Sequence, residues 1–350
     1  MRKFDYSFLE SEAIPNNVVS YLFVIERNKT LSETFKVSYP KVFNNLVKIA
    51  KVQSVKDSNA IEGIVSTDKR IESIVNKKTE PLNHNEQEIA GYRDALEIIH
   101  QDYQTIDIDT RELLLLHKTL LEHAQTPSRG KFKETNNIIV QINSDGSRSV
   151  RFTPLSAQET PKAIEQMLLA FYEARSNSNI NPLLLIPCFI LDFLCIHPFS
   201  DGNGRMSRLL TLLLLYQSGY DVGKYVSLEH MINKNKASYY QRLYESSTGW
   251  TENKNSYWPF IENFLLILLS TYNELTDRYN IIKDKKLSKS ERIEETIKQT
   301  LGKISKEELY RIWPDISVNT IELELSRLLK EGLIKKVGTT NGASYYWIGK

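Results

Sequence analysis

The sequence predicts a mostly helical protein, and three observations support that prediction. Glycine and proline are sparse, with 14 and 11 of the 350 residues. Long segments repeat apolar residues at helical spacing. Two apolar runs, Leu183 to Leu194 and Leu209 to Tyr216, are long enough to form buried helices. The short polar segment between these runs would then be a loop held on two rigid supports.

Composition limits the class of protein. The apolar content of 41 % and charged content of 25 % are ordinary for a soluble globular chain of two or three domains. The net charge of +2 does not define a partner. The N-terminus lacks the apolar core of a signal peptide, and no apolar run reaches the length of a membrane span. We therefore expect a cytoplasmic protein without a membrane partner.

Cysteine and histidine do not form a metal pattern. Cys188 and Cys195 lie seven residues apart in one apolar segment, as expected for two cysteines on one buried helix face. The six histidines show no pair at ligand spacing, so a structural zinc is not predicted. His117 and His123 lie among leucines, and we expect both in the core or at an interface.

The N-terminal third predicts three helices. Residues 1 to about 40 show little periodicity beyond an apolar patch at Val18 to Ile25. An apolar stripe predicts a helix from Lys41 to Ile61 that ends at Gly63. Two more helices are expected, at 85–103 and at 109–124. Asn83, Asn85 and Glu88 at the start of the first of these resemble a capping box. Ser58 and Glu62 share one helix face, and on this pattern alone they form a solvated pair at a helix end.

Residues 131–153 change to a strand pattern. Alternating residues at 137–142 and 149–152, joined by the turn residues 143–146, predict a β-hairpin. An isolated ribbon has little stability, so we expect it against a helical body. Such a ribbon beside a site is suited to clamp an extended peptide, and the alternative is a hairpin that only covers core.

Helices resume after the hairpin. The expected ranges are 161–175, 183–194, 207–217 ended by Gly219, 236–245 and 257–279. Residues 280–290 are polar and basic, which predicts a connector. The chain then predicts helices at 291–302, around 304–310 and at 318–331. Ser317 would cap the last of these and Gly332 would stop it. Turns are expected at Pro314-Asp315 and Asn341-Gly342, and a terminal hairpin at 333–348.

This C-terminal pattern resembles a winged helix-turn-helix. Its third helix would be the recognition helix, and acidic residues outnumber basic ones there: Glu322, Glu324 and Glu331 against Arg327 and Lys330. Such a helix is a poor surface for phosphate backbones. A protein-contact or dimerisation role therefore stands beside DNA binding.

The segment Ile196 to Arg208 holds the densest polar chemistry. A helix starting near Asn203 offers free backbone N–H groups, and Gly202 and Gly204 let phosphate approach them closely. Arg205 and Arg208, three residues apart, could clamp more than one phosphate oxygen from the same side. The segment therefore predicts an anion site, with a helix-capping loop that bears surface arginines as the alternative.

Three further side chains extend this site. Asp201 precedes the anion site and suits Mg²⁺, which prefers one carboxylate together with phosphate and water. His197 can accept a proton near neutral pH and so activate a hydroxyl. Phe199 should point into the core. The parts fit phosphoryl or nucleotidyl transfer, although the spacing and lysine of a P-loop are lacking.

The run His197-Pro198-Phe199-Ser200-Asp201-Gly202-Asn203-Gly204-Arg205-Met206-Ser207-Arg208 resembles the complete H-x-F-x-D-G-N-G-R-x-x-R signature of the Fic family. The likeness continues through 116–121, 129–132, 152–154 and Tyr239-Tyr240 with Leu243, and so covers about 40–280. It implies an all-α fold with a helical Fic core and a β-hairpin flap, plus a small C-terminal winged helix-turn-helix. The implied regions are 1–110, 111–280 with the flap at 137–153 and the motif at 197–208, and 283–350.

The resemblance also implies an activity, the transfer of AMP from ATP to a Ser, Thr or Tyr hydroxyl of a target protein or of the chain itself. His197 would be the general base, Asp201 would hold Mg²⁺, and Arg208 would bind the γ-phosphate. The remaining ATP-binding positions would be Gly202, Asn203 and Gly204 with Arg205 at the α- and β-phosphates, and Tyr239 or Tyr240 near the adenine with Asn235 as a further candidate. The hairpin would register the target by strand addition. Ser247 stands where some members have asparagine, which bears on nucleotide preference.

The run from Ser58 to Gly63 is similar to the (S/T)-x-x-x-E-(G/N) inhibitory motif of members with an N-terminal regulatory helix. Glu62 would then pair with Arg208 and occupy the space of the γ-phosphate. This implies an autoinhibited adenylyltransferase, in many relatives a homodimer. Two alternatives remain at this stage: removal of AMP, with Glu62 positioning a water, and a nucleotide-sensing winged-helix regulator that binds DNA.

Overall fold

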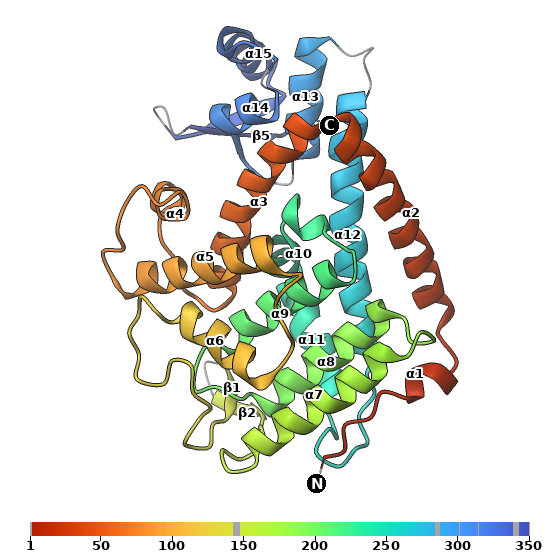
Figure 1. Cartoon of the computed structure of the whole chain (residues 1–350). Coiled ribbons are helices and arrows are strands. Elements are labelled where there is room, and N and C mark those ends of the chain that lie inside the picture. Colours follow the sequence, from red (N-terminus) through yellow and green to blue (C-terminus); the bar gives the residue numbers. More distant parts are fainter. Residues whose placement is uncertain are drawn as a thin grey trace.

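Helices make up most of the computed structural model, which describes residues 2–142, 148–283, 288–300, 302–313, 315–338 and 343–349 (Figure 1). The first helices are α1 (Phe8–Ser11), α2 (Asn16–Ser38), α3 (Pro40–Ile61), α4 (Asp68–Val75), α5 (His84–Asp102) and α6 (Thr110–Leu120). The others of the main body are α7 (Thr160–Ser176), α8 (Pro182–Ile196), α9 (Asn203–Gln217), α10 (Leu228–Lys234), α11 (Lys236–Ser247) and α12 (Trp258–Lys283). The predicted helical class is confirmed.

The two apolar runs of the sequence form α8 and α9 at the centre of the main body. Every residue of α8 after its first is buried, and nearly all of α9 is. A buried carboxylate on α8, Asp192, accepts hydrogen bonds from Trp250 Nε1 (2.6 Å) and Tyr6 Oη (2.8 Å) and pairs with Arg2 Nη2 (3.2 Å). These contacts tie the N-terminal arm to α8, so the helix that precedes the polar loop is fixed from several sides.

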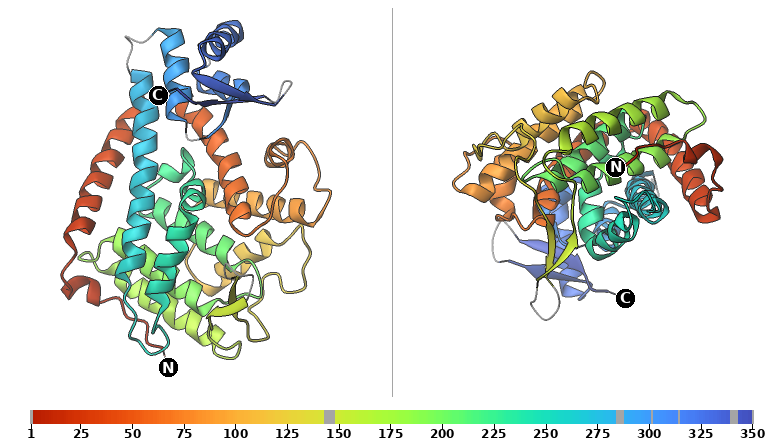
Figure 2. Two further views of the ribbon diagram at one scale, coloured as in Figure 1. Left: turned by 180° about the vertical axis from the view of Figure 1, so that it is seen from behind. Right: turned by 90° about the horizontal axis from the view of Figure 1, so that it is seen from below.

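Four helices of the main body were not expected from the sequence: α1, α2, α4 and α10. Helix α2 runs along α12 (Figure 1 and Figure 2). Its buried face includes Asn28, whose amide donates to Asn273 Oδ1 (2.8 Å), while Phe23 on α2 is 70 % exposed. Because α2 has polar residues on its buried face and apolar residues on its exposed face, its sequence lacks the apolar repeat by which an amphipathic helix is recognised.

The helix predicted from Lys41 is α3, and Gly63 follows it with a φ of +82°, as a C-terminal cap requires. The cap of α5 differs from the prediction. Asn83 Oδ1 accepts from the Glu86 amide (3.0 Å), whereas Glu88 takes no part in a capping box and pairs with Arg205 instead. The capping-box variant is therefore wrong, because the Glu88 carboxylate pairs with the side chains of His84 and Arg205.

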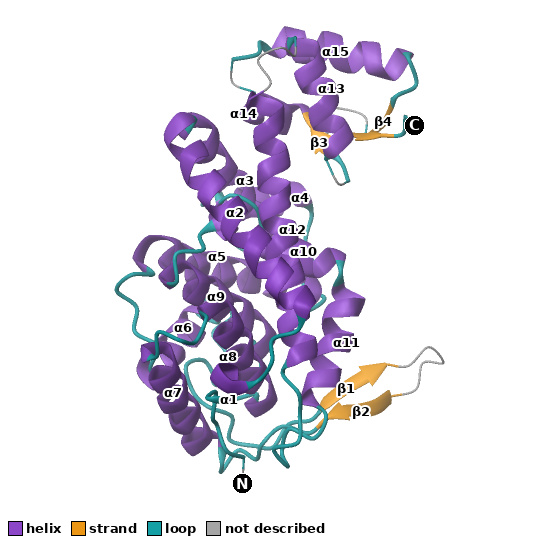
Figure 3. Cartoon of the chain, turned by 90° about the vertical axis from the view of Figure 1, so that its right-hand side faces the viewer, coloured by secondary structure: helices purple, strands orange, loops and turns teal. Residues whose placement is uncertain are grey.

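The predicted hairpin is present as β1 (Ile139–Ile142) and β2 (Arg148–Phe152), which pair antiparallel. Figure 3 shows it projecting from one side of the helical body. Phe152 packs against Trp250, which attaches the base of the ribbon to the core. The predicted turn at 143–146 lies outside the described residues.

The chain ends in a separate hydrophobic cluster, here called the C-terminal unit (residues 288–349). Its elements are α13 (Lys289–Gln299), β3 (Ile304–Ser305), α14 (Lys306–Ile312), α15 (Val318–Lys330), β4 (Ile334–Val337) and β5 (Ser344–Trp347), with the sheet order β3-β5-β4. Ser317 caps α15 and Gly332 follows it with a φ of +70°, as predicted. The predicted helices and the terminal strand pair are present, and the winged helix-turn-helix stays a prediction. Pro314 and the Asn341-Gly342 turn lie outside the described residues.

Two general expectations can be compared with the structure. Cys188 and Cys195 are both buried and free. Across the described residues, no helix combines the length and apolar character needed to cross a membrane.

Candidate functional site

The polar loop between α8 and α9 begins at His197, whose backbone adopts a left-handed conformation with a φ of 52°. This conformation is costly for a residue other than glycine, so surrounding contacts must hold it. Asn203, the first residue of α9, does so from inside the loop. Its Oδ1 accepts from the Phe199 amide (2.9 Å) and its Nδ2 donates to Phe199 O (2.8 Å). The predicted helix start near Asn203 is confirmed.

A buried lysine, Lys133, holds the same loop from outside. Its Nζ donates to Ile196 O and to Asn137 Oδ1, both at 3.0 Å, and its amide donates to Pro198 O (2.9 Å). Burial lowers the pKa of Lys133 to about 8. Because Ile196 and Pro198 flank His197, and Asn137 lies at the base of the hairpin, Lys133 joins the hairpin to the histidine turn. Lys133 was not predicted from the sequence, although it directly follows a segment that resembles the family.

The His197 ring is suited to accept a proton. Its Nδ1 lies 3.3 Å from Leu194 O. With the ring proton on Nδ1 and directed at that carbonyl, Nε2 keeps its lone pair. Burial, above the other influences, lowers the pKa of His197 to about 4. The imidazole is therefore neutral at physiological pH, which is the state that a general base needs.

The anion site is predicted at the start of α9. Met206 N donates to Gly202 O (2.8 Å) in the first helical hydrogen bond, so the amides before it have no helical acceptor. Gly202 has a φ of +80°, and a Cβ at Gly204 would lie only 2.2 Å from Glu62 Oε1. A carboxylate oxygen of Glu62 therefore lies against Gly204, within the predicted anion site.

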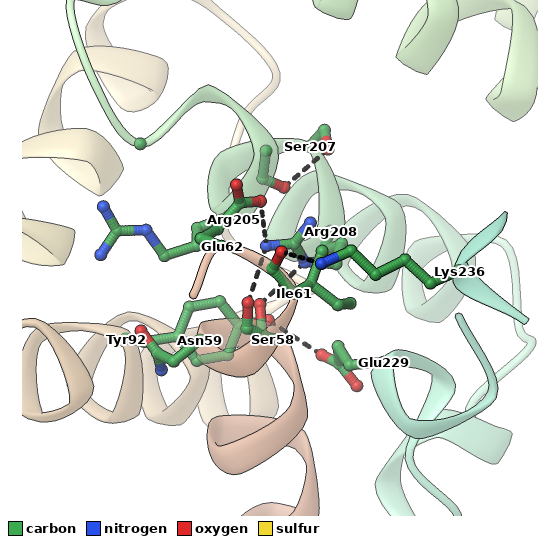
Figure 4. A network of polar contacts seen from close by, with 12 residues as sticks. Ser58, Asn59, Ile61, Glu62, Tyr92, Arg205, Ser207, Arg208, Glu229 and Lys236 are labelled. Carbon is green, nitrogen blue, oxygen red and sulfur yellow. Dashed lines mark hydrogen bonds and ion pairs between the residues drawn. The ribbon is translucent and has the colours of Figure 1, made fainter. Parts of the chain in front are cut away.

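Arg208 contacts the segment from Ser58 to Glu62 through three hydrogen bonds (Figure 4). Its Nη2 lies 2.8 Å from Glu62 Oε1 and 2.9 Å from Ser58 O, and its Nε donates to Ser58 Oγ (2.8 Å). Its guanidinium is buried, whereas the Glu62 side chain is 31 % exposed. The structure therefore brings together residues 150 positions apart, and Ser58 and Glu62 are not a solvated pair.

Other contacts hold the end of α3 at this site. Lys236 Nζ donates to Ile61 O (2.6 Å), and Asp57 on α3 accepts from His230 Nδ1 (2.8 Å). Two cations, Arg208 and Lys236, therefore satisfy carbonyls at the negative end of the helix, which is a favourable arrangement. Gly63 makes no side-chain contact and serves only the backbone turn.

Arg205 lies elsewhere than predicted. Its guanidinium is buried and bonds to Glu88 Oε2 (2.7 Å) and Asp201 Oδ2 (3.2 Å), and Figure 4 shows it directed away from Arg208. The predicted clamp by both arginines from one side is therefore wrong. Helical spacing alone suggested it, and the carboxylate of Glu88 on α5, which turns Arg205 away, is more than a hundred residues distant in sequence.

Asp201 lies at the mouth of the anion site with its side chain 64 % exposed. Its Oδ1 accepts from the Gly202 amide (2.6 Å), and Oδ2 faces Arg205. In the described part of the chain, no group of three or more His, Cys, Asp or Glu residues could hold a metal by itself. One exposed carboxylate beside a phosphate site nevertheless fits Mg²⁺, which takes its other ligands from phosphate and water.

Three residues suggested for adenine lie around the start of α11. Tyr239 is buried and Tyr240 half-buried, with ring centroids 5.5 Å apart. Asn235 Nδ2 donates to Met231 O (3.0 Å), so its amide serves the end of α10. Arg151, the bulged residue of β2, donates to Tyr240 O and lies over the Tyr240 ring. The hairpin therefore contacts the edge of this region.

Two further predictions concern packing around the site. Phe199 is fully buried and stacks on the His117 ring at 3.7 Å, as expected for a loop anchored in the core. Ser247 is buried and donates to Tyr244 O (3.0 Å).

Known proteins resemble this chain in part of its sequence and in its fold. Residues 107–215 match the model of the Fic/DOC family. This segment of the chain is similar to that family. The Fic segment so defined includes α6, the hairpin, α7, α8 and most of α9, and therefore the complete loop from His197 to Arg208.

Two relatives illustrate the sequence similarity. Protein adenylyltransferase Fic of Nematostella vectensis is 28 % identical over 183 residues, which are 50 % of this chain and 39 % of the relative. Protein adenylyltransferase fic-1 of Caenorhabditis elegans is 27 % identical over 142 residues, 39 % of this chain and 25 % of the relative. The chain thus spans well under half the length of these relatives.

Solved structures show the same fold. A Fic family protein from Desulfovibrio desulfuricans aligns with a TM-score of 0.62 at 19 % identity and covers 97 % of this chain and 98 % of its own. A Fic domain containing signaling protein from Bacteroides thetaiotaomicron aligns with a TM-score of 0.59 at 20 % identity, covering 74 % and 95 %. The helical Fic fold that the motif implied is confirmed.

Proposed function

We propose that this Fic protein is an autoinhibited adenylyltransferase that transfers AMP from ATP to a hydroxyl side chain of a protein. One observation carries the proposal. Arg208 lies in an anion site at the start of α9, and its partner is Glu62, a carboxylate from another part of the chain. A polyanion such as ATP competes for that position. The names of the relatives, protein adenylyltransferases, support the same reaction.

The reaction follows from the positions of the side chains. The target hydroxyl loses its proton to His197 Nε2 while its oxygen attacks the α-phosphorus of ATP, the bond to the β-phosphate oxygen breaks, and pyrophosphate leaves. The amides around Gly202, Asn203 and Gly204 stabilise phosphate oxygens, and Arg208 holds the γ-phosphate. Mg²⁺, held by Asp201, would neutralise charge on the phosphates.

Inhibition needs only a modest free energy. If the closed state is more stable than the open state by about 2.7 kcal/mol of free energy, about 99 % of the molecules are closed. The buried Arg208 makes one charged and two further hydrogen bonds to the Ser58–Glu62 segment, which is sufficient for that difference. Removing the Glu62 carboxylate should therefore free the γ-phosphate position.

The test uses ATP labelled on the α-phosphate with Mg²⁺. The variant Glu62→Gly should place label on protein, in a lysate or on itself, and the double variant Glu62→Gly/His197→Ala should place none. Mass spectrometry of the labelled protein then identifies the transferred group and the modified side chain. If Glu62→Gly transfers nothing to any protein, AMP transfer is the wrong reaction.

Removal of AMP is a second candidate, favoured by one observation. The Glu62 carboxylate is partly exposed and lies in the anion site, where it can orient a water. Protein modified beforehand should then lose its label faster with wild-type chain than with Glu62→Gly. Equal rates of loss would exclude this reaction.

The DNA-binding alternative receives little support from the charges of α15. Arg327 pairs with Glu294, Glu324 and Glu331, and Lys306 pairs with Glu322. Cations that are already paired release few counterions from DNA.

The proposal also includes a target protein and modification of the chain by itself. It includes a homodimer as well, and sedimentation measures the proportion of dimer.

A further inference from the structure

One residue of the C-terminal unit contacts both helices that flank the inhibitory segment. Arg311, on α14, accepts a hydrogen bond through its carbonyl from Asn45 Nδ2 of α3 (2.8 Å). Its Nη2 pairs with Glu72 Oε1 of α4 (2.6 Å). Helix α3 precedes Glu62 and α4 follows it. Arg311 therefore joins the chain before the inhibitory glutamate to the chain after it.

The geometry links this contact to the site. Helix α3 has 22 residues, so it is a rod of about 33 Å, with Asn45 near its start and Glu62 just beyond its end. Figure 1 and Figure 2 show the C-terminal unit beside the start of α3, far from the hairpin. Helix α4 begins at Asp68, only six residues after Glu62. Glu62 directly follows α3, and only residues 63–67 separate it from α4. A shift of either helix therefore changes the position of Glu62.

The charges of the C-terminal unit single out this residue. Arg292 pairs with Asp315, Arg327 with three carboxylates, and Lys306 with Glu322, all inside the unit. Arg311 also pairs with Glu307 of its own helix, but its second carboxylate, Glu72, belongs to the main body. Both members of that pair are about one third exposed, so the contact is modest and can be broken.

We propose that the C-terminal unit is the regulatory module of this protein and that it stabilises the inhibited state by holding α3 and α4 together through Arg311. This inference rests on the proposed function. Glu62 must leave Arg208 before the γ-phosphate can bind, and the ends of α3 and α4 must then change their relative position. The Arg311 bridge opposes that change, so whatever detaches the unit favours the open state.

The test compares variants in two backgrounds. In the chain that keeps Glu62, Arg311→Ala and Glu72→Arg should each raise AMP transfer about two- to fivefold, as expected for a partly exposed pair that acts on a closed equilibrium. In the Glu62→Gly background neither should change the rate, because no inhibitory contact is left to weaken. The charge swap Arg311→Glu/Glu72→Arg should restore the low rate.

A matched control breaks an ion pair within the unit. Lys306→Met removes the pair with Glu322, which lies inside the unit and whose members have similar exposure. It should leave the rate unchanged. Unchanged transfer in Arg311→Ala and Glu72→Arg, while Glu62→Gly is active, would overturn the inference and leave the proposed function intact.

A second measurement does not depend on activity. Hydrogen exchange of the amides at 55–62 and 68–75 should be faster in Arg311→Ala than in the wild-type chain or in Lys306→Met. If Glu62→Gly transfers no label, the proposed function fails, and this measurement alone decides the coupling. Equal exchange in all three proteins would then overturn it.

Discussion

Helix α9 in the Fic core and helix α15 in the C-terminal unit each carry an arginine that pairs with carboxylates, and they differ in how that arginine is paired. Arg208 on α9 is buried and pairs with one carboxylate, Glu62, that comes from a distant helix. Arg327 on α15 is 41 % exposed and pairs with three carboxylates, two of them on or next to its own helix.

The difference separates a ligand site from a structural network. Glu62 can leave α9 without unfolding it, because it lies at the end of α3 and is partly exposed. The amides and glycines at the start of α9 would then receive another anion. On α15 the carboxylates stay with the helix, so an anionic ligand finds no free cation at Arg327. An arginine alone therefore does not indicate a phosphate site. An arginine indicates one when its paired carboxylate comes from another part of the chain and can move away.

The largest expected effect concerns Arg208. In the Glu62→Gly background, Arg208→Ala should lower AMP transfer about 10² to 10³-fold, since one preorganised cation on the phosphates is lost. Transfer of labelled AMP at saturating ATP measures it. Arg327→Ala serves as the comparison, and a loss of similar size in that variant would contradict the distinction between the two helices.

A smaller effect is expected at Lys133. Lys133→Met leaves the carbonyls of Ile196 and Asn137 Oδ1 without a buried donor, so the His197 turn should be less well held. We expect kcat to fall about tenfold in the Glu62→Gly background with the Kd for ATP unchanged, because Lys133 does not touch the anion site. The exposed neighbour Lys131→Met is the control. Equal losses in both variants would show that Lys133 has no special role.

Acid should weaken the main body more than the C-terminal unit. Burial lowers the pKa of His100 to about 3 and those of His117 and His197 to about 4, against about 6.5 in an unfolded chain. The unfolded state therefore binds more protons, and stability present above pH 6.5 is lost as the pH falls toward 4. The C-terminal unit contains no histidine.

Between pH 7 and pH 5 we expect each of these histidines to remove about 2 kcal/mol, and the three together roughly 5 kcal/mol, from the free energy of unfolding of the main body. Hydrogen exchange at α8 and at α15 in the same sample measures the two regions together. Parallel loss of protection in both would contradict the prediction.

Gly204 tests the close contact with Glu62. A methyl group there would meet Glu62 Oε1, so Gly204→Ala should weaken the inhibitory pair. Urea unfolding should show a larger destabilisation in the wild-type chain than in Glu62→Gly, with a coupling of about 1 kcal/mol. An additive pair of substitutions would mean that Glu62 does not occupy the anion site in solution.

The smallest effect is expected on α15. Arg327→Ala removes an exposed network, and such pairs contribute little. The melting temperature should shift by no more than about 2 °C, and AMP transfer should not change. A strong reduction in transfer would assign Arg327 to the reaction and remove the contrast with Arg208.

Much of this arrangement could be predicted from the sequence, because its signals are local. Gly63 marks the end of α3, and Gly202 marks the start of α9. The apolar runs that form α8 and α9 must be buried in the core. Helix α2 was missed because Asn28 and Ser32 lie on its buried face. A short helix such as α4 leaves too few residues for a period.

Contacts between distant residues were predictable only through resemblance. The pair of Arg208 with Glu62 was implied by two motifs, and the structure contains it. The pair of Arg205 with Glu88 belongs to neither motif, and helical spacing alone placed Arg205 wrongly beside Arg208. Lys133 was missed for the same reason: its partners are backbone carbonyls of the loop, which no side-chain pattern reveals.

The central claim is that Glu62 occupies the γ-phosphate position on Arg208 and thereby blocks AMP transfer. The most direct measurement is the binding of ATP with Mg²⁺ and the transfer of its α-label, compared between the wild-type chain and Glu62→Gly. The account predicts at least about tenfold more transfer by Glu62→Gly, with label lost again in Glu62→Gly/His197→Ala. Equal transfer by both proteins, or label that persists without His197, would contradict it.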